Sequence, residues 1–294
     1  MSRYLDATND LAFKKVFSDK GIMKDFLNSI LGESWGSIIE EIEFIPTEEI
    51  PDLGQGKRSI FDLKCRDQEG NWFVIEMQNR KQLHFLERVQ FYASHTYVSQ
   101  LSRGGMHKGL LPVILIAISK EKILPSDVGY ISYHKTKEEM TNKQHLFALS
   151  YVFIELEKFK KKENELKSIE DYWLYFLANS QGSGEPPVSV KDPFVLKAYD
   201  RLERFNWSEG EYDAYIRARL LAEAEEMTLQ DNLQNAREEG LKEGEAKGLK
   251  EGKEEGLKEA RWQIAKSMLE KKSFDLQDIS KITGLSIEEL NKLK

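Results

Sequence analysis

Residues 59–78, SIFDLKCRDQEGNWFVIEMQ, decide the fold, because they contain two runs of β-forming residues on either side of a short polar segment. The runs cover residues 59–66 and 72–78, and the segment between them includes glycine and asparagine, which favour tight turns. This pattern predicts a β-hairpin whose turn is centred on Glu69.

The predicted hairpin brings two acidic residues together. Strand residues at equal distances from the turn centre pair with each other, so Asp62 should lie opposite Glu76, with Cβ atoms about 4.5 to 5.5 Å apart. Residues two apart share a face of a strand, which places Lys64 with Asp62 and Gln78 with Glu76. Opposed carboxylates among apolar neighbours repel each other. A shared proton, a cation such as Lys64 or a divalent metal ion relieves that repulsion.

The alternative for this acidic pair has no catalytic role. The two carboxylates would then lie on a solvent-facing edge of the sheet, or Lys64 would neutralise them as part of a structural ion pair.

The sequence around the hairpin predicts further helices and strands. Apolar residues at helical spacing predict helices over residues 9–17, 22–31 and 82–101. Short apolar runs predict strands over residues 38–45 and 111–119. The second run is apolar throughout, so we expect a central strand that is buried on both faces.

Two of these helices carry polar candidates for a site. On the helix after the hairpin a polar stripe is predicted opposite the apolar one, formed by His84, Arg88, Tyr92 and His95. Arg88 is the natural phosphate ligand among them, and the alternative is an ordinary solvated face. On the first helix, which Thr8 is expected to cap, Asp10 and Lys14 either form a surface ion pair or reach the site.

The rest of the chain is predicted to be mainly helical after one more pair of strands. The strands are expected over residues 128–135 and 146–154, and helices over residues 165–177 and from 193 to about 237. We therefore expect four parts, namely an α/β domain at 1–155, a helical extension at 156–236, a charged glycine-repeat segment at 237–261 and a small helical tail at 262–294.

The glycine-repeat segment has a glycine at every fourth position from Gly240 to Gly256. Each glycine costs a helix about 1 kcal/mol relative to alanine, so an isolated helix here would be marginal. We interpret the segment as a spacer or self-associating helix that would support a homo-oligomer, with a flexible tether as the alternative. The tail has helix-turn-helix spacing, but its last helix opens with Glu288 and Glu289, which favours a small interaction module over a DNA reader.

The composition narrows the classes of protein further. The chain has 294 residues, one cysteine and a formal net charge of −7. The single cysteine excludes an internal disulfide and thiolate metal clusters, and the longest apolar run is too short to span a bilayer. We expect a cytoplasmic protein without membrane insertion, in which any nucleic-acid binding is local or metal-assisted.

The order and spacing of several short motifs resemble those of the recombination-promoting nuclease/putative transposase (Rpn) family of the PD-(D/E)XK nuclease superfamily. The resemblance covers roughly residues 5 to 155 and is carried by Asn9-Asp10, Phe13-Lys14, Asp62, Glu76-Met77-Gln78, Arg88 and Tyr92. It implies a restriction-endonuclease-like α/β core with a central mixed sheet flanked by helices. It also implies a DNA endonuclease that uses Mg²⁺, with Mn²⁺ as a second option.

The resemblance also implies roles for individual residues. Asp62 and Glu76 would bind the metal ion, Asp10 would assist, and Arg88 and Tyr92 would contact the substrate. Gln78 stands where the superfamily usually has lysine, and an amide can orient water but carries no charge. Lys64 or Lys14 is the candidate substitute for that lysine. The alternative function is a catalytically silent protein that binds DNA or assembles with itself on the same fold.

Overall fold

The computed structural model describes residues 2–32, 35–46, 63–79, 84–101, 109–271 and 273–293. The chain divides into two compact units, Met1–Leu221 and Ala222–Lys294. In the described ranges, no helix is both long enough and apolar enough to cross a membrane.

The first unit is built around a mixed six-stranded sheet, counted over the described residues, with the strand order β1-β2-β3-β4-β6-β5. Strand β4 pairs in parallel with β3 and with β6, and the other neighbouring pairs are antiparallel. The strands are β1 Ile42–Phe44, β2 Leu63–Asp67, β3 Trp72–Gln78, β4 Val113–Ser119, β5 Ile131–Lys135 and β6 Leu149–Glu155.

The predicted hairpin and its register are confirmed over the described part of β2. Leu63 pairs with Ile75 and Arg66 pairs with Trp72, so the turn is centred on Glu69. Gly70 in this turn has a φ of 84°, a backbone conformation that favours glycine. Asp62, the residue predicted to face Glu76, lies outside the described residues.

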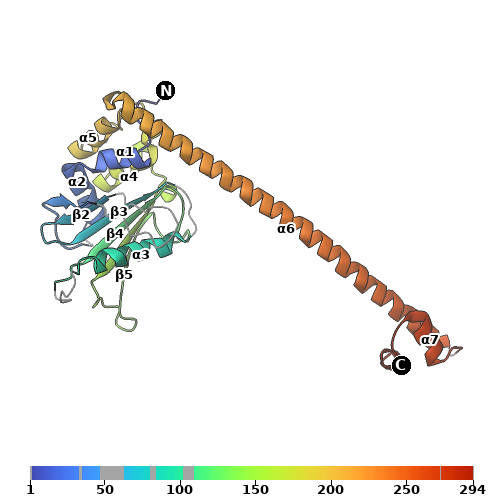
Figure 1. The fold of residues 1–294 in the computed structure, drawn as a ribbon. Coiled ribbons are helices and arrows are strands. Elements are labelled where there is room, and N and C mark those ends of the chain that lie inside the picture. The colour runs from blue at the N-terminus through green and yellow to red at the C-terminus, as the bar shows by residue number, and fades with distance from the viewer. Residues whose placement is uncertain are drawn as a thin grey trace. The chain divides into compact units, whose positions relative to one another are not determined.

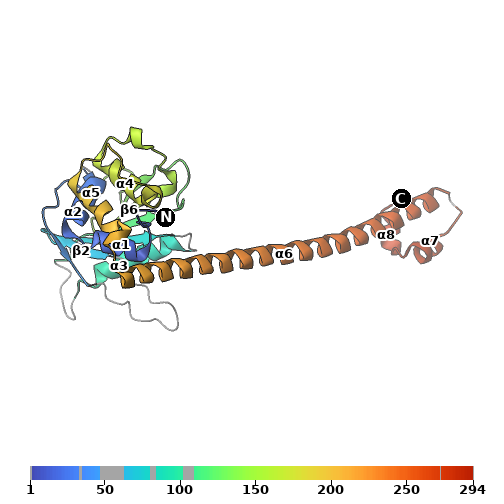
Figure 2. The ribbon, with the colours of Figure 1, turned by 90° about the horizontal axis from the view of Figure 1, so that it is seen from above.

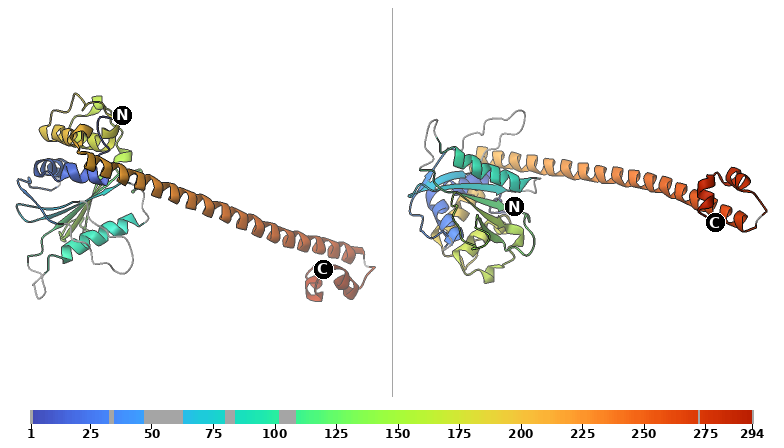
Figure 3. Two further views of the ribbon diagram at one scale, coloured as in Figure 1. Left: turned by 45° about the horizontal axis from the view of Figure 1, so that its top comes forward. Right: turned by 90° about the horizontal axis from the view of Figure 1, so that it is seen from below.

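Helices cover both faces of the sheet (Figures 1 and 3). One face is covered by α1 Asp10–Phe17, α2 Lys20–Leu31, α4 Ile169–Asn179 and α5 Pro193–Leu202, whose apolar side chains share one core with alternate residues of the strands. Figure 2 shows these helices from above. The other face carries α3 Phe85–Val98 and a smaller core. Residues of α4 and α5 therefore pack with the sheet and belong to the first unit.

Strand β4 is the centre of this arrangement. All seven of its residues are buried, and the six apolar ones from Val113 to Ile118 belong alternately to the two cores. The prediction of a central strand buried on both faces is confirmed, because a parallel strand between two helical layers has no solvent-facing side.

Some helices and strands begin at other residues than predicted, because side chains form hydrogen bonds with backbone groups at their ends. Strand β1 begins at Ile42 rather than at residue 38, since the Gln68 side chain accepts from the Glu40 amide at 3.1 Å and donates to the Ile38 carbonyl at 2.9 Å. Helix α1 is capped by Asn9 and not by Thr8, because Asn9 Oδ1 accepts from the Leu11 and Ala12 amides.

The helical run predicted from residue 193 is interrupted between α5 and α6. Ser208 and Glu211 form reciprocal hydrogen bonds, with each side chain accepting from the backbone amide of the other residue, and so start the new helix. Lys15 of α1 pairs with Glu211 at 2.7 Å and lies over the Trp207 ring, which ties the beginning of α6 to α1. Short 3₁₀ turns connect the other elements at Leu156–Lys158, Glu163–Glu165, Ser180–Gly182 and Arg204–Asn206.

Helix α6 runs over Glu209–Lys271 and is followed by α7 Leu276–Thr283 and α8 Ile287–Asn291. The glycine-repeat segment is therefore helical in this structure, and its self-association stays a prediction. A Cβ added at any glycine from Gly240 to Gly256 would meet nothing within 4 Å. A small core of Ala265, Ile279, Leu285 and Leu290 packs the end of α6 against α7 and α8.

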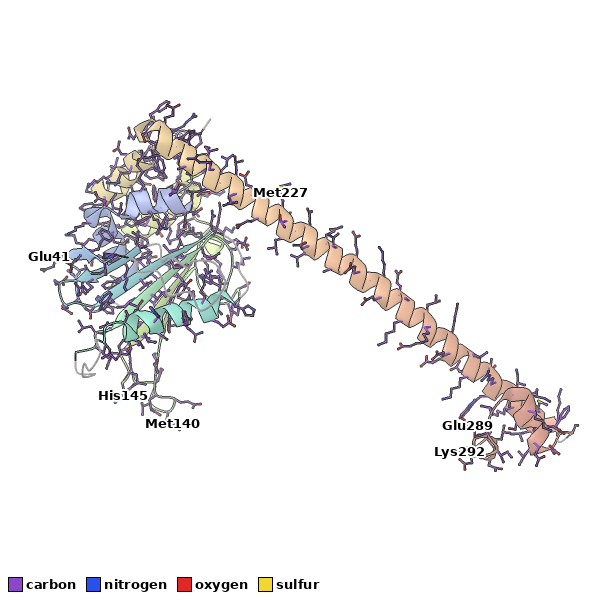
Figure 4. The ribbon with its side chains drawn as sticks, viewed as in Figure 1. Glu41, Met140, His145, Met227, Glu289 and Lys292 are labelled. Carbon is purple, nitrogen blue, oxygen red and sulfur yellow. The ribbon has the colours of Figure 1, made fainter. Side chains whose placement is uncertain are left out.

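The connection between β5 and β6 extends beyond the sheet and carries Met140 and His145 (Figure 4). Met140, Leu146 and Phe147 in this connection are exposed.

Candidate functional site

The candidate site lies at the carboxyl end of β3, on the face of the sheet that α3 covers. Val74, Glu76 and Gln78 alternate along β3 onto this face, and Val74 belongs to the core beneath α3. The strand then carries two polar side chains into a largely apolar layer, where Glu76 is 7% exposed and Gln78 is 5% exposed. Burying two polar groups side by side costs free energy unless they find partners.

Arg88 of α3 is a partner for both of these groups. Its Nη2 lies 3.2 Å from Glu76 Oε1, and the same atom donates to Gln78 Oε1. The other carboxylate oxygen, Glu76 Oε2, is buried and has no hydrogen-bond partner among the described residues. Among the described residues, Arg88 thus satisfies one of the two Glu76 carboxylate oxygens.

Burial raises the pKa of Glu76 to about 7, from an ordinary value of 4.5. Three neighbouring charges modify this effect, since Arg88 lowers the pKa, Asp10 raises it and Lys14 lowers it. At neutral pH this carboxyl therefore exchanges a proton readily, and a bound cation would favour its ionised form.

Two charges on the first helix, Asp10 and Lys14, act electrostatically on Glu76. They lie one turn apart on α1, with Lys14 Nζ 3.7 Å from Asp10 Oδ2, and both are close enough to act on the Glu76 carboxyl. The ion pair that the sequence offered as one alternative is present on the surface, and a role for either residue in the site stays a prediction.

Lys64 occupies a different position. It is buried on β2 opposite Val74, and its Nζ lies 4.6 Å from the centre of the Trp72 ring. The neighbouring charges that shift the Glu76 pKa come from α1 and α3. Lys14 is therefore better placed than Lys64 to act on Glu76.

The predicted polar stripe opposite the apolar side of the helix does not include Tyr92. Tyr92 is 2% exposed and belongs to the core between α3 and the sheet. Arg88 also turns toward the sheet, with its guanidinium carbon 5.8 Å from the centre of the Tyr92 ring. Arg88 turns inward because Glu76 and Gln78 give its guanidinium charged and polar partners below α3, whereas Tyr92 packs in the apolar core there.

The sequence did not single out the residues that link β3 to its surroundings. Lys120 follows β4 directly; its amide donates to the Gln78 carbonyl at 3.1 Å, and its Nζ lies 3.1 Å from Asp6 Oδ2. Thr8 contacts the Asn79 side chain at 3.2 Å. A signal for Lys120 was present, since functional groups gather beyond the carboxyl ends of parallel strands, where β3 and β4 both end.

The described residues contain no group of three or more histidine, cysteine or acidic side chains that could hold a metal ion. They do contain Glu76 Oε2, a buried oxygen without a hydrogen-bond donor. Carboxylate oxygens are preferred ligands of Mg²⁺ and Mn²⁺, so this residue fits a divalent cation that takes its remaining ligands from water, substrate or other side chains.

The comparisons with known proteins agree with this geometry. A model of the PD-(D/E)XK nuclease family transposases matches residues 7–231, which include the whole sheet, the helices around it and the candidate site. The searches of curated proteins and of solved structures gave no significant match. The mixed sheet flanked by helices is consistent with the restriction-endonuclease-like fold, and the resemblance to the Rpn transposases is confirmed. With three quarters of its length covered by one family model, the chain belongs to the PD-(D/E)XK nuclease family transposases.

Proposed function

We propose that the protein is a DNA endonuclease that hydrolyses phosphodiester bonds with Mg²⁺, or alternatively Mn²⁺, at the carboxyl end of β3. The observation that carries this proposal is the Glu76 carboxylate, which is buried at a strand end with one oxygen unpartnered among the described residues. A bound divalent ion would activate water and stabilise negative charge on the phosphodiester.

Asp62 is proposed as the second metal ligand. It precedes Leu63 in the sequence, and the register measured from Leu63 to Arg66 supports its predicted pairing with Glu76. The assignment of Asp62 otherwise rests on the sequence.

The charge that the superfamily usually takes from a lysine at position 78 is proposed to come from α1. Gln78 would orient the attacking water through its amide, and Lys14 would supply the positive charge. Asp10 would assist by holding Lys14 one helical turn away. Lys64 is the second option for the lysine role, supported by its position on the same face of the sheet.

Arg88 is proposed to act on the substrate phosphate, since a guanidinium matches phosphate oxygens in shape and charge. Its contact with Glu76 supports this, because the same guanidinium lies beside the carboxylate proposed to bind the metal ion. Tyr92 would contribute by supporting Arg88 from below rather than by touching DNA.

The test is Mg²⁺-dependent nicking of supercoiled plasmid DNA by Glu76→Gln. This change keeps the size of the side chain and removes its charge, so we expect cleavage to fall by about 100-fold or more. Glu87→Gln is the matched control, because Glu87 is an exposed residue of α3. Cleavage by Glu76→Gln at the rate of this control would remove Glu76 from the site and with it the proposal.

The second candidate function is a catalytically silent protein that binds DNA or assembles with itself through α6. It is favoured by Gln78, which lacks the usual positive charge, and by the open surface around the glycines of α6. Size-exclusion chromatography and cleavage assays on the full chain and on a chain ending at Arg237 separate the two functions. An oligomer that depends on the tail, together with no cleavage by either chain at any metal concentration, would select the silent protein.

The biological setting is proposed from the family. DNA cleavage by a transposase-related nuclease would serve recombination or the movement of genetic elements. A cytoplasmic location is supported by the single, buried and unpaired Cys65.

A further inference from the structure

Asp6, in the segment before α1, is a point at which several elements of the first unit meet. Its Oδ2 lies 3.1 Å from the Nζ of Lys120, which directly follows β4, and its amide donates to the Tyr215 hydroxyl of α6 at 3.1 Å. Its carbonyl accepts from the amide of Asn9, the residue that caps α1, at 3.1 Å. One residue thus contacts the end of a central strand, the beginning of α1 and the first turns of α6.

The same side chain is linked to the end of β3 through Thr8. Asp6 Oδ1 accepts from the Thr8 amide at 2.9 Å and from the Thr8 hydroxyl at 2.6 Å. That hydroxyl also lies 3.2 Å from the Oδ1 of Asn79, the residue that follows Gln78. Thr8 is only 1% exposed, so its hydroxyl relies on these protein partners rather than on water.

Lys120 joins the two strand ends to Asp6. Its amide donates to the Gln78 carbonyl at 3.1 Å, which continues the pairing of β3 with β4, and its side chain pairs with Asp6. The Asp6 side chain is 16% exposed and the Lys120 side chain is 48% exposed. An ion pair this exposed adds little to the overall stability of a protein, so its main effect here is on where the N-terminal segment lies.

The position of the N-terminal segment determines where α1 begins. Helix α1 is only eight residues long, and Asp10 and Lys14 lie in its first two turns. A helix this short moves as one body, so a shift of its first turn also shifts Lys14. Both residues act electrostatically on Glu76, and that interaction changes with distance.

We propose that Asp6 is a positioning residue for the cleavage reaction, because it holds the beginning of α1 against the ends of β3 and β4 and so sets the distance between Lys14 and Glu76. The inference rests on the proposed function for the role of Lys14. Asp6 acts through α1 and is not itself a catalytic residue. The expected effect is large for an exposed ion pair, since a misplacement of about 1 Å can slow an enzyme by about 100-fold.

The test separates cleavage from DNA binding. Single-turnover nicking of plasmid DNA with Mg²⁺, and fluorescence anisotropy of a labelled DNA duplex in EDTA, are measured for the natural full chain, Asp6→Asn and Glu43→Gln. Asp6→Asn keeps an oxygen that can accept from Thr8 and removes the charge that pairs with Lys120. Glu43→Gln is the matched control, because it removes an exposed ion pair with Arg66 between β1 and β2.

Asp6→Asn should lower the cleavage rate by about 10-fold and leave the affinity for DNA within about twofold of the natural chain, because a positioning residue changes the reaction rather than the binding. Glu43→Gln should change neither quantity. Equal cleavage by the two variants would overturn the proposal. A change in DNA affinity as large as the change in rate, in either direction, would also overturn it, since Asp6 or Lys120 would then act on binding.

A double-mutant cycle tests the path through Lys120. Lys120→Gln should slow cleavage as Asp6→Asn does, because both changes break the same contact. Asp6→Asn/Lys120→Gln should then lie within about twofold of the slower single variant. Losses that multiply in the double variant would mean that the two residues act independently, and would overturn the proposed path.

Hydrogen exchange in EDTA gives a measurement that does not need cleavage. The Phe13 amide donates to the Asn9 carbonyl in the first turn of α1. Its exchange should be about two- to fivefold faster in Asp6→Asn than in the natural chain and in Glu43→Gln. Unchanged exchange in Asp6→Asn would overturn the role of Asp6 in holding α1. Absence of cleavage by the natural chain would instead remove the proposed function, and the exchange rates alone would then decide whether Asp6 holds α1.

Discussion

Strand β3 and the glycine-repeat segment of α6 differ in how much of each is buried. Six of the seven residues of β3 are buried. The strand pairs with β2 and β4, and its side chains pack against the helices on both faces of the sheet. The residues of α6 from 222 to 264 are almost all exposed, and their glycines meet nothing within 4 Å. Packing therefore determines the structure of the first region, whereas intrinsic helix preference and side-chain pairs one turn apart, such as Lys247 with Glu251, support the second in this single chain.

The largest expected change in stability comes from a substitution in the packed core of the first unit. Trp173 is fully buried beside Phe17, Phe26 and Phe176 and donates to Asp25 at 2.8 Å. Trp173→Ala should lower the free energy of unfolding by about 3 to 5 kcal/mol, measured by urea denaturation. Trp262→Ala on α6 is the matched control, and we expect a change within about 0.5 kcal/mol. Equal losses for both variants would mean that α6 is packed against a partner.

The next largest change concerns the free energy that burial of the Glu76 carboxylate costs the folded protein. The pKa of Glu76 is raised to about 7 in the folded chain, so its protonated form favours folding, and stability is lost as the pH rises from about 4.5 to about 7. In EDTA, Glu76→Gln should be more stable than the natural chain by up to about 3 kcal/mol at pH 8, with no difference below about pH 4.5. Thermal unfolding across this pH range measures the difference. A variant that is less stable than the natural chain at pH 8 would contradict the buried charge.

The smallest effects compare two glycines. Gly70 has a φ of 84° and a Cβ there would lie 2.7 Å from Leu111 Cδ1, so Gly70→Ala should destabilise the first unit by about 1 kcal/mol or more. Gly248→Ala meets open space in a helix and should stabilise α6 locally by up to about 1 kcal/mol. Urea denaturation measures the first change, and slower hydrogen exchange of the amides near residue 248 measures the second. Faster exchange in Gly248→Ala would indicate that a partner helix covers the glycines.

The parts of the fold that could be predicted from the sequence follow local rules. The turn centre at Glu69 determined the register of β2 and β3, and the unbroken apolar run predicted the buried β4. The helix around Gly248 was one of the two interpretations of the glycine repeat. Each of these sequence patterns lies within about twenty residues, so the local structure follows from neighbouring residues alone.

The parts that could not be predicted depend on distant residues. The sequence placed Glu76 and Gln78 on one face of β3, but it could not show that Arg88 turns inward to meet them, because the helical period alone gives two polar faces for α3. The link from Lys120 to Asp6 joins residues more than a hundred positions apart. The break before α6 was missed although Ser208 and Glu211 have the spacing of a capping box.

Two consecutive lysines of α1 give the molecule a mechanical connection. Lys14 acts on the Glu76 carboxyl, and Lys15 pairs with Glu211 in the first turn of α6. Consecutive residues of a helix point about 100° apart, so α1 can direct one lysine toward Glu76 of β3 and the other toward the beginning of α6. The first turns of α6 are also anchored by Tyr215, which is buried in the core and accepts from the Asp6 amide. A pull or twist applied along α6 would therefore reach α1 partly through the Lys15 ion pair, one residue away from a side chain that lowers the pKa of Glu76.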